Sequence, residues 1–212
     1  MTPKRRLAAF VFIFAAISSI EYAVGQVLPR DKFKMVAFDG LELDSPGGVE
    51  VLGVKYGGMP EFRRDENSQE VGSYCYIAQD GSEAIFETFT SDHINSVQVR
   101  RSAPEVDREW CYPARLKSFA EMDANGLRLS MRRDQVEALL GGPGLTRDGV
   151  TTYEDYYTRP LTLEEQEIVR KNRWHYDGFD YSKLEAEEST IIQFEYQDSM
   201  TSSYYISRFT SL

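Results

Sequence analysis

The chain has only two cysteines and two histidines among its 212 residues. His93 and His175 lie far apart, and neither belongs to a His-x-x-x-His or Cys-x-x-Cys pattern, so no zinc site is predicted. A Gly-x-Ser-x-Gly nucleophile elbow, a phosphate-binding loop and a dinucleotide-binding fingerprint are also missing from the sequence. These absences predict neither a cofactor nor a metal and argue against an enzyme, with a periplasmic hydrolase as the remaining catalytic alternative.

Positive charge is scarce, because 24 lysines and arginines face 34 acidic residues and the formal net charge is −10. An acidic surface repels phosphate, so nucleic acid and anionic lipid are excluded as expected partners. A basic protein or a cation would be attracted to it. The alternative is that the charge serves solubility alone.

Long apolar runs are missing except at residues 7–20, which carry no charge. Residues 4–6 before this run are basic, and the small residues 23–25 after it match a signal-peptidase site. The run is short for a bilayer-spanning helix, so residues 1–25 are predicted to be a secretory signal peptide, although a retained segment would act as an anchor. Cleavage before Gln26 removes three positive charges and one negative charge, which takes the net charge from −10 to −12. The mature protein is therefore expected to be periplasmic or secreted, without a stable membrane anchor.

Cys75 and Cys111 are the two cysteines. In an exported protein an even count favours a disulfide, and only one pairing exists here. Closing this loop is expected to contribute roughly 4 kcal/mol to stability. Two reactive thiols are the alternative.

Side-chain alternation and turn residues predict an α+β protein with an antiparallel sheet that follows its helices. Strands are expected at residues 73–78, 84–90, 96–101, 151–158, 190–196 and 203–209. Helices are expected at residues 46–56, 113–124, 131–140 and 162–171. The last of these begins with a capping box, because Glu165 follows Thr162 by three residues.

The mature chain divides into two predicted halves, residues 26–104 and 105–212, which share sparse similarities. An insertion near 161–185 in the second half accounts for the increase in spacing between matching positions, from 83 to 108 residues, further along the chain. The matching positions are Gly40-Leu41-x-Leu43 with Gly126-Leu127-x-Leu129, Val49 and Leu52 with Val136 and Leu139, Gly58-x-Pro60 with Gly141-x-Pro143, and Phe86-Glu87 and Arg100 with Phe194-Glu195 and Arg208. Identities this sparse also occur by chance, so the repeat is a hypothesis.

Residues 127–144, LRLSMRRDQVEALLGGPG, carry a recognisable pattern. Its positions are Met131, Asp134-Gln135-Val136, Leu139-Leu140-Gly141 and Pro143. The segment resembles the helix of the BamE/SmpA family of small outer-membrane assembly lipoproteins, and it is equally similar to the related fold of the β-lactamase inhibitor protein, a tandem of such units. The resemblance implies two units, each a helix pair on an antiparallel sheet. This chain lacks the family's lipid-accepting cysteine.

Aromatic side chains flank the insertion, with acidic residues interleaved. The aromatic residues are Tyr153, Tyr156, Tyr157, Trp174, Tyr176 and Phe179. Aromatics with a charged rim are typical of protein-binding hot spots, although the same residues could fill the inner face of the sheet. The sequence therefore predicts an exported, non-catalytic protein-binding module of the cell envelope. The alternative is an inhibitor or immunity protein that covers a basic enzyme or toxin.

Overall fold

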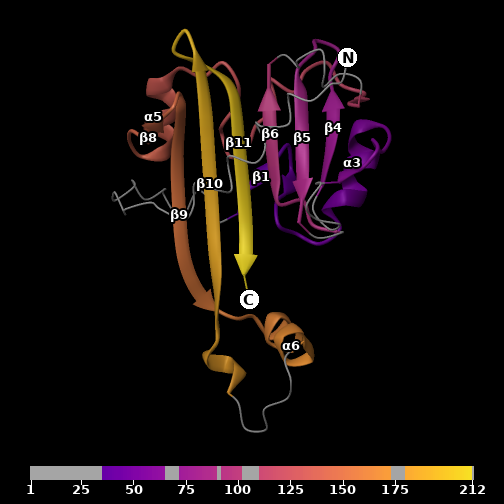
Figure 1. Ribbon diagram of the computed structural model, residues 1–212, viewed down its shortest axis with the longest axis vertical. Helices are drawn as coiled ribbons and strands as arrows, with labels where there is room; N and C mark the ends of the chain where they lie inside the picture. Colours follow the sequence, from indigo (N-terminus) through magenta and orange to yellow (C-terminus); the bar gives the residue numbers. More distant parts are fainter. Residues whose placement is uncertain (1–34, 65–71, 90–91, 102–109, 173–179, 212) are drawn as a thin grey trace, which may run out of the picture.

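The computed structural model describes residues 35–64, 72–89, 92–101, 110–172 and 180–211. The predicted signal segment and the boundary between the halves at 104/105 lie outside these residues. In the described part, strands predominate over helices and most of them join one long twisted sheet (Figure 1).

The main sheet has nine strands. They are β3 (Arg63–Arg64), β4 (Gly72–Ile77), β5 (Glu83–Thr88), β6 (Ser96–Arg100), β7 (Tyr112–Pro113), β8 (Leu145–Arg147), β9 (Val150–Pro160), β10 (Glu185–Gln197) and β11 (Met200–Ser211). Their order is β3-β4-β5-β6-β11-β10-β9-β8, and β7 pairs with β4 in parallel while the other neighbours are antiparallel. Because β6 pairs with β11, the two predicted halves share a single sheet.

The remaining elements are short. They are the hairpin β1 (Ala37–Phe38) and β2 (Leu41–Glu42), the helices α3 (Gly48–Tyr56), α5 (Arg133–Leu140) and α6 (Leu163–Asn172), and the 3-10 turn η2 (Tyr181–Lys183). The predicted fold of two helix-pair units is wrong, since in the described residues a single helix precedes the strands of each half. α6 belongs to the insertion.

The helix predicted at residues 113–124 does not form, and its backbone explains why. The N–H of Ala114 donates to the carbonyl of Ile77 at 2.8 Å, and the N–H of Arg115 donates to the carbonyl of Tyr56 at 3.0 Å. These bonds hold the segment against β4 and the end of α3. The carbonyls of Leu116 and Lys117, which a helix would need for its own ladder, accept from the backbone after β4 instead. Tertiary pairing has therefore overridden local helix propensity.

The main core lies on one face of the sheet, and we call this face the helix-covered face. Leu52 and Tyr56 of α3 and Val136 and Leu140 of α5 are buried there with alternate residues of the central strands. Strand side chains alternate between faces, so the next residues along each strand belong to the opposite face. On that face Cys75, Ile85 and Cys111 form a second, smaller buried cluster.

The same turn occurs at residues 38–41 and at residues 124–127. In each turn the first and last residues pair with each other, and the two residues between them have positive φ. These φ values are 49° and 76° in the first turn and 53° and 89° in the second. Such φ values define a type I′ turn and explain the Gly at the second central position of both. The two turns lie beside each other, because Phe38 bridges to Ala124.

The ends of α3 and α5 also match. Gly57 and Gly141 close the helices with φ of 92° and 88°. The hydroxyl of Tyr76 then donates to the carbonyl of Gly58 at 2.9 Å, and the hydroxyl of Tyr153 donates to the carbonyl of Gly142 at 3.2 Å. The structure therefore aligns Gly57 with Gly141, one residue away from the alignment that the sequence suggested.

The predicted match of Arg100 with Arg208 is not reproduced by the strand register. Phe86 faces Val97 and Phe194 faces Tyr204, so Arg100 is equivalent to Ser207. A shift of one residue reverses the face of a strand side chain. Arg100 consequently lies on the opposite face, and Arg208 lies on the helix-covered face.

Candidate functional site

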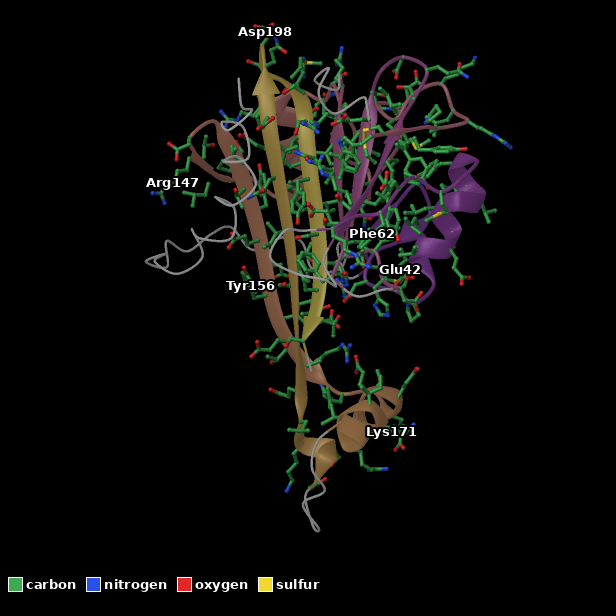
Figure 2. The ribbon with its side chains drawn as sticks, turned by 45° about the vertical axis from the view of Figure 1, so that its right-hand side comes forward. Glu42, Phe62, Arg147, Tyr156, Lys171 and Asp198 are labelled. Atoms are coloured by element: carbon green, nitrogen blue, oxygen red, sulfur yellow. A yellow bond between two sulfur atoms is a disulfide. The ribbon has the colours of Figure 1, made fainter. Side chains whose placement is uncertain are left out.

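The insertion forms an arm at one end of the sheet, which we define as residues 157–172 and 180–188. It contains the distal ends of β9 and β10 with α6 and η2 between them, and it projects beyond the short strands β4 to β6 (Figure 1). Figure 2 shows Lys171 on α6, near the tip. The arm is the part of the second half that has no counterpart in the first.

A predicted capping box fixes the start of α6. The N–H of Glu165 donates to the hydroxyl of Thr162 at 3.2 Å, and the N–H of Thr162 donates to the Glu165 carboxylate at 2.7 Å. This reciprocal pair satisfies backbone donors at the helix N-terminus. The capping-box prediction is confirmed.

A charged network fixes the base of the arm to the sheet. Glu188 of β10 is buried and contacts Tyr157 and Arg159 of β9 and Arg208 of β11. Arg159 also forms a bidentate pair with Glu165 of α6, with both N–O distances 2.6 Å. One network therefore connects three strands to the arm helix.

The network keeps its carboxylates ionised. Hydrogen bonds from Arg159 are the main reason that the pKa of Glu165 is lowered to about 2. Burial alone would raise the pKa of Glu188, but hydrogen bonds from Tyr157 and Arg159 and the charges of two arginines lower it overall. A carboxylate with a lowered pKa is a poor proton donor at neutral pH, so these acids suit a structural or binding role better than general acid catalysis.

A small apolar cluster supports the arm under α6. Leu161, Val169 and Ala186 are buried together, and Leu184 packs against them. Other apolar side chains of α6 face solvent, since Leu163 is 85% exposed and Ile168 is 43% exposed. The arm thus has its own support and still presents apolar groups on the exposed side of α6.

The aromatic residues predicted as binding groups have different surroundings. Tyr153 is buried in the main core, where its hydroxyl bonds to Gly142, and Tyr157 belongs to the charged network. Tyr156, on the opposite face of β9, is 58% exposed (Figure 2). Trp174, Tyr176 and Phe179 lie outside the described residues.

Strands β9 and β10 form a two-stranded ribbon. Its face opposite the helix-covered face is acidic around Tyr156. Strand alternation and register place Glu154 of β9 and Glu185, Glu187 and Glu195 of β10 on this face, with no lysine or arginine from either strand. Burial raises the pKa of Glu154, because its carboxylate is partly removed from water. A cation from a partner would relieve that cost.

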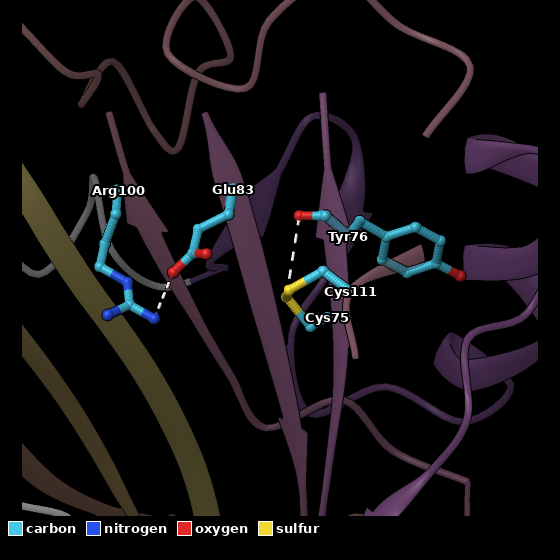
Figure 3. Close-up of a disulfide and its surroundings, with 5 residues drawn as sticks. All are labelled: Cys75, Tyr76, Glu83, Arg100 and Cys111. Carbon is cyan, nitrogen blue, oxygen red and sulfur yellow. Dashed lines mark hydrogen bonds and ion pairs between the residues drawn. A yellow bond between two sulfur atoms is a disulfide. The ribbon is translucent and has the colours of Figure 1, made fainter. Parts of the chain in front are cut away.

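The predicted disulfide is confirmed, with Cys75 of β4 bonded to Cys111 just before β7. Figure 3 shows Glu83 nearby, buried and paired with Arg100 of β6. The two sulfurs and the Glu83 carboxylate lie close together, but sulfurs bonded to each other are not thiolate ligands. This cluster therefore offers no metal-ligand set in the oxidised protein.

A basic hollow lies at the β3 edge of the sheet. It is lined by Glu61, Phe62, Arg63, Arg64 and Trp110, and it was missed by the sequence analysis. The arm network was missed as well, although polar residues at alternate positions of β10, including Glu188 and Thr190, were a possible signal. For the hollow there was no such signal, because its residues come from two distant polar segments.

No protein-family model matches this chain, and neither the curated proteins nor the solved structures provide a match. The resemblance of residues 127–144 to the assembly lipoproteins therefore stays a prediction. Within the described ranges, no helix has the length and apolar character needed to cross a membrane.

Proposed function

We propose that this chain is an exported, non-catalytic protein-binding module of the cell envelope, and that its arm contacts the partner. The observation that carries the proposal is an arm with a fixed base and exposed apolar side chains on its helix. Arg159 and Glu188 tie the base to the sheet, while Leu163 exposes its side chain on α6. An arm that is already ordered loses little conformational entropy on binding, so more of the contact energy remains as affinity.

Export is supported by two independent features. Residues 1–25 have the layout of a secretory signal peptide. The Cys75–Cys111 disulfide is the kind of bond that persists in oxidising compartments and is rare in reducing ones. A periplasmic or secreted location is therefore part of the proposal.

The chemistry of the ribbon favours a basic partner. Glu154, Glu185 and Glu187 share the opposite face with Tyr156, whose ring can also receive a cation. Complementary charge steers association and makes it sensitive to salt. This acidic face supports the second candidate function, an inhibitor or immunity protein that covers a basic enzyme or toxin.

The test compares two substitutions of exposed apolar residues, Leu163→Asp on the arm and Val54→Asp on α3, which is 89% exposed. Both positions tolerate a charge without loss of the fold, since surface substitutions usually change stability by less than about 0.5 kcal/mol. The oxidised wild-type chain and both variants are immobilised and incubated with envelope extract, and retained proteins are identified by mass spectrometry.

The proposal expects a partner that the wild type and Val54→Asp retain and that Leu163→Asp loses. Identical retention by all three proteins would contradict a binding role for the arm. If the retained partner is an enzyme whose activity falls when the chain is added, the inhibitor candidate is favoured. An unchanged activity favours a binding module without inhibition.

A further inference from the structure

The basic hollow at the β3 end of the sheet differs in charge from the rest of the molecule. Arg63 and Arg64 are adjacent and exposed, in a chain whose net charge is −10. The guanidinium of Arg63 lies over the ring of Trp110, 5.2 Å from its centroid. The hollow has a volume of about 390 Å³, which falls within the roughly 300–1,000 Å³ of ligand pockets.

Its donors lack acceptors among the described residues. No carboxylate of the described part forms an ion pair with Arg63 or Arg64, although Glu61 lines the same hollow. The indole N–H of Trp110 is buried and has no hydrogen-bond acceptor there. A buried donor without an acceptor is destabilising, and the two guanidinium groups offer several more donors at the surface.

The hollow is also held in place on several sides. The ring of Phe62 packs against Tyr74 with a centroid distance of 5.1 Å, and the backbone of Arg63 and Arg64 pairs with β4. The disulfide ties Cys111, next to Trp110, to the same strand. A site that is ordered before binding needs little further ordering when a ligand arrives.

We propose that this hollow binds an acidic peptide segment of a partner protein. Arg63 and Arg64 are consecutive residues of a strand, so their side chains leave β3 toward opposite faces. Two guanidinium groups on either side of an edge strand match two separate carboxylates of one extended chain better than a single phosphate. Each planar guanidinium can pair with a carboxylate through two parallel hydrogen bonds.

This surface is independent of the arm and opposite to it in charge. The β9–β10 ribbon presents glutamates, and the hollow presents arginines at the β3 edge of the sheet. The chain would thus recognise a basic surface and an acidic segment at two separate places. Failure of either proposal leaves the other standing.

The test uses the fluorescence of Trp110 in the full oxidised chain carrying Trp174→Phe, which leaves Trp110 as its one tryptophan. Hexaglutamate is titrated at constant ionic strength, with hexaglutamine, acetate and inorganic phosphate in parallel. Saturable binding of hexaglutamate alone is expected, and Arg63→Gln and Arg64→Gln should each weaken it by about tenfold. The matched control is Arg147→Gln on β8, an exposed arginine at the opposite edge of the sheet, which should change nothing.

Three results would overturn the proposal. Phosphate that binds as tightly as hexaglutamate, with the same arginine dependence, would mean a site for a small oxyanion. Equal weakening by Arg147→Gln would mean non-specific attraction. Self-association in sedimentation that Arg64→Gln abolishes would mean that the acidic ribbon of a second copy fills the hollow. Unchanged circular dichroism of the variants confirms that these results report on binding.

Discussion

The two halves of the sheet contain the same local devices but are stabilised and extended differently. Each half has a type I′ turn, a short helix that ends at a left-handed glycine, and a strand tyrosine that bonds to the residue after that glycine. A disulfide links β4 of the first half to Cys111 at the start of the second, and the second half adds an arm held by a buried charged network. The shared devices build the core, whereas the differences mark the surfaces where the two halves can act separately.

The largest expected effect tests whether the halves unfold together. Phe86→Ala and Phe194→Ala each remove a fully buried ring from the central strand of one half, so each should cost about 3–5 kcal/mol of stability. Because β6 and β11 join the halves in one sheet, both variants should show a single urea transition by circular dichroism. Two separate transitions would mean that the halves are independent folding units.

The disulfide should matter chiefly around β4 and β7, which it holds together. Substituting both Cys75 and Cys111 by alanine should cost about 2–4 kcal/mol, since the unfolded chain gains the freedom of an open loop. Hydrogen exchange should increase in β4 and β7 and stay unchanged in α6. Equal loosening of α6 would show that the arm depends on the first half.

The charged network is the corresponding device of the second half. Glu188→Gln leaves Arg159 and Arg208 without their shared carboxylate, so a loss of about 1.5–3 kcal/mol is expected in urea unfolding. The control is Glu187→Gln, its exposed neighbour on the other face, for which a change within about 0.5 kcal/mol is expected. Similar losses from both variants would indicate a general charge effect.

Acid should loosen the arm before the rest of the sheet. The pKa of Glu165 is lowered from 4.5 to about 2 in the folded chain, so its pairing with Arg159 stabilises the fold fully above pH 4.5 and loses this effect as the pH falls toward 2. The effect should be smaller than that of Glu188→Gln, because the pair is partly exposed and screened. The protection factors of the α6 amides, normalised to the intrinsic exchange rate at each pH, should fall between pH 5 and 2, and constant protection factors would contradict the prediction.

The smallest expected effect is also the most direct test of equivalence. Tyr76→Phe and Tyr153→Phe each remove one hydroxyl that bonds to the carbonyl after a helix end. Each should cost about 0.5–1.5 kcal/mol, and the two losses should be similar. A clear loss for one variant and none for the other would mean that the shared geometry does not carry equal energy.

Local features were well predicted from the sequence. The strands near residues 73–78, 84–90 and 96–101, the capping box of α6 and the glycine that ends α5 all appear in the structure. The disulfide was predicted because only one pairing was possible. These features depend on turn geometry, alternation and chain connectivity, which short stretches of sequence encode.

The candidate site was predicted only in part. Residues near the insertion were selected, but Tyr153 is a core residue, and the network partners Arg159, Glu188 and Arg208 were not expected together. Their meeting depends on the register of β9, β10 and β11, in which a shift of one residue reverses the face. The same kind of uncertainty caused the wrong pairing of Arg100 with Arg208.

By itself the sequence determined the turns, most strand positions, the acidic charge and the disulfide, because each follows from neighbouring residues or from composition. Only the tertiary structure decided that one sheet spans both halves, that residues 113–124 pair with β4 and α3 rather than form a helix, and that Arg63 meets Trp110. The physical reason is the distance along the chain over which each kind of interaction acts. Backbone preferences act over a few residues, whereas strand order, register and the burial of charge are decided by contacts between segments far apart in the chain.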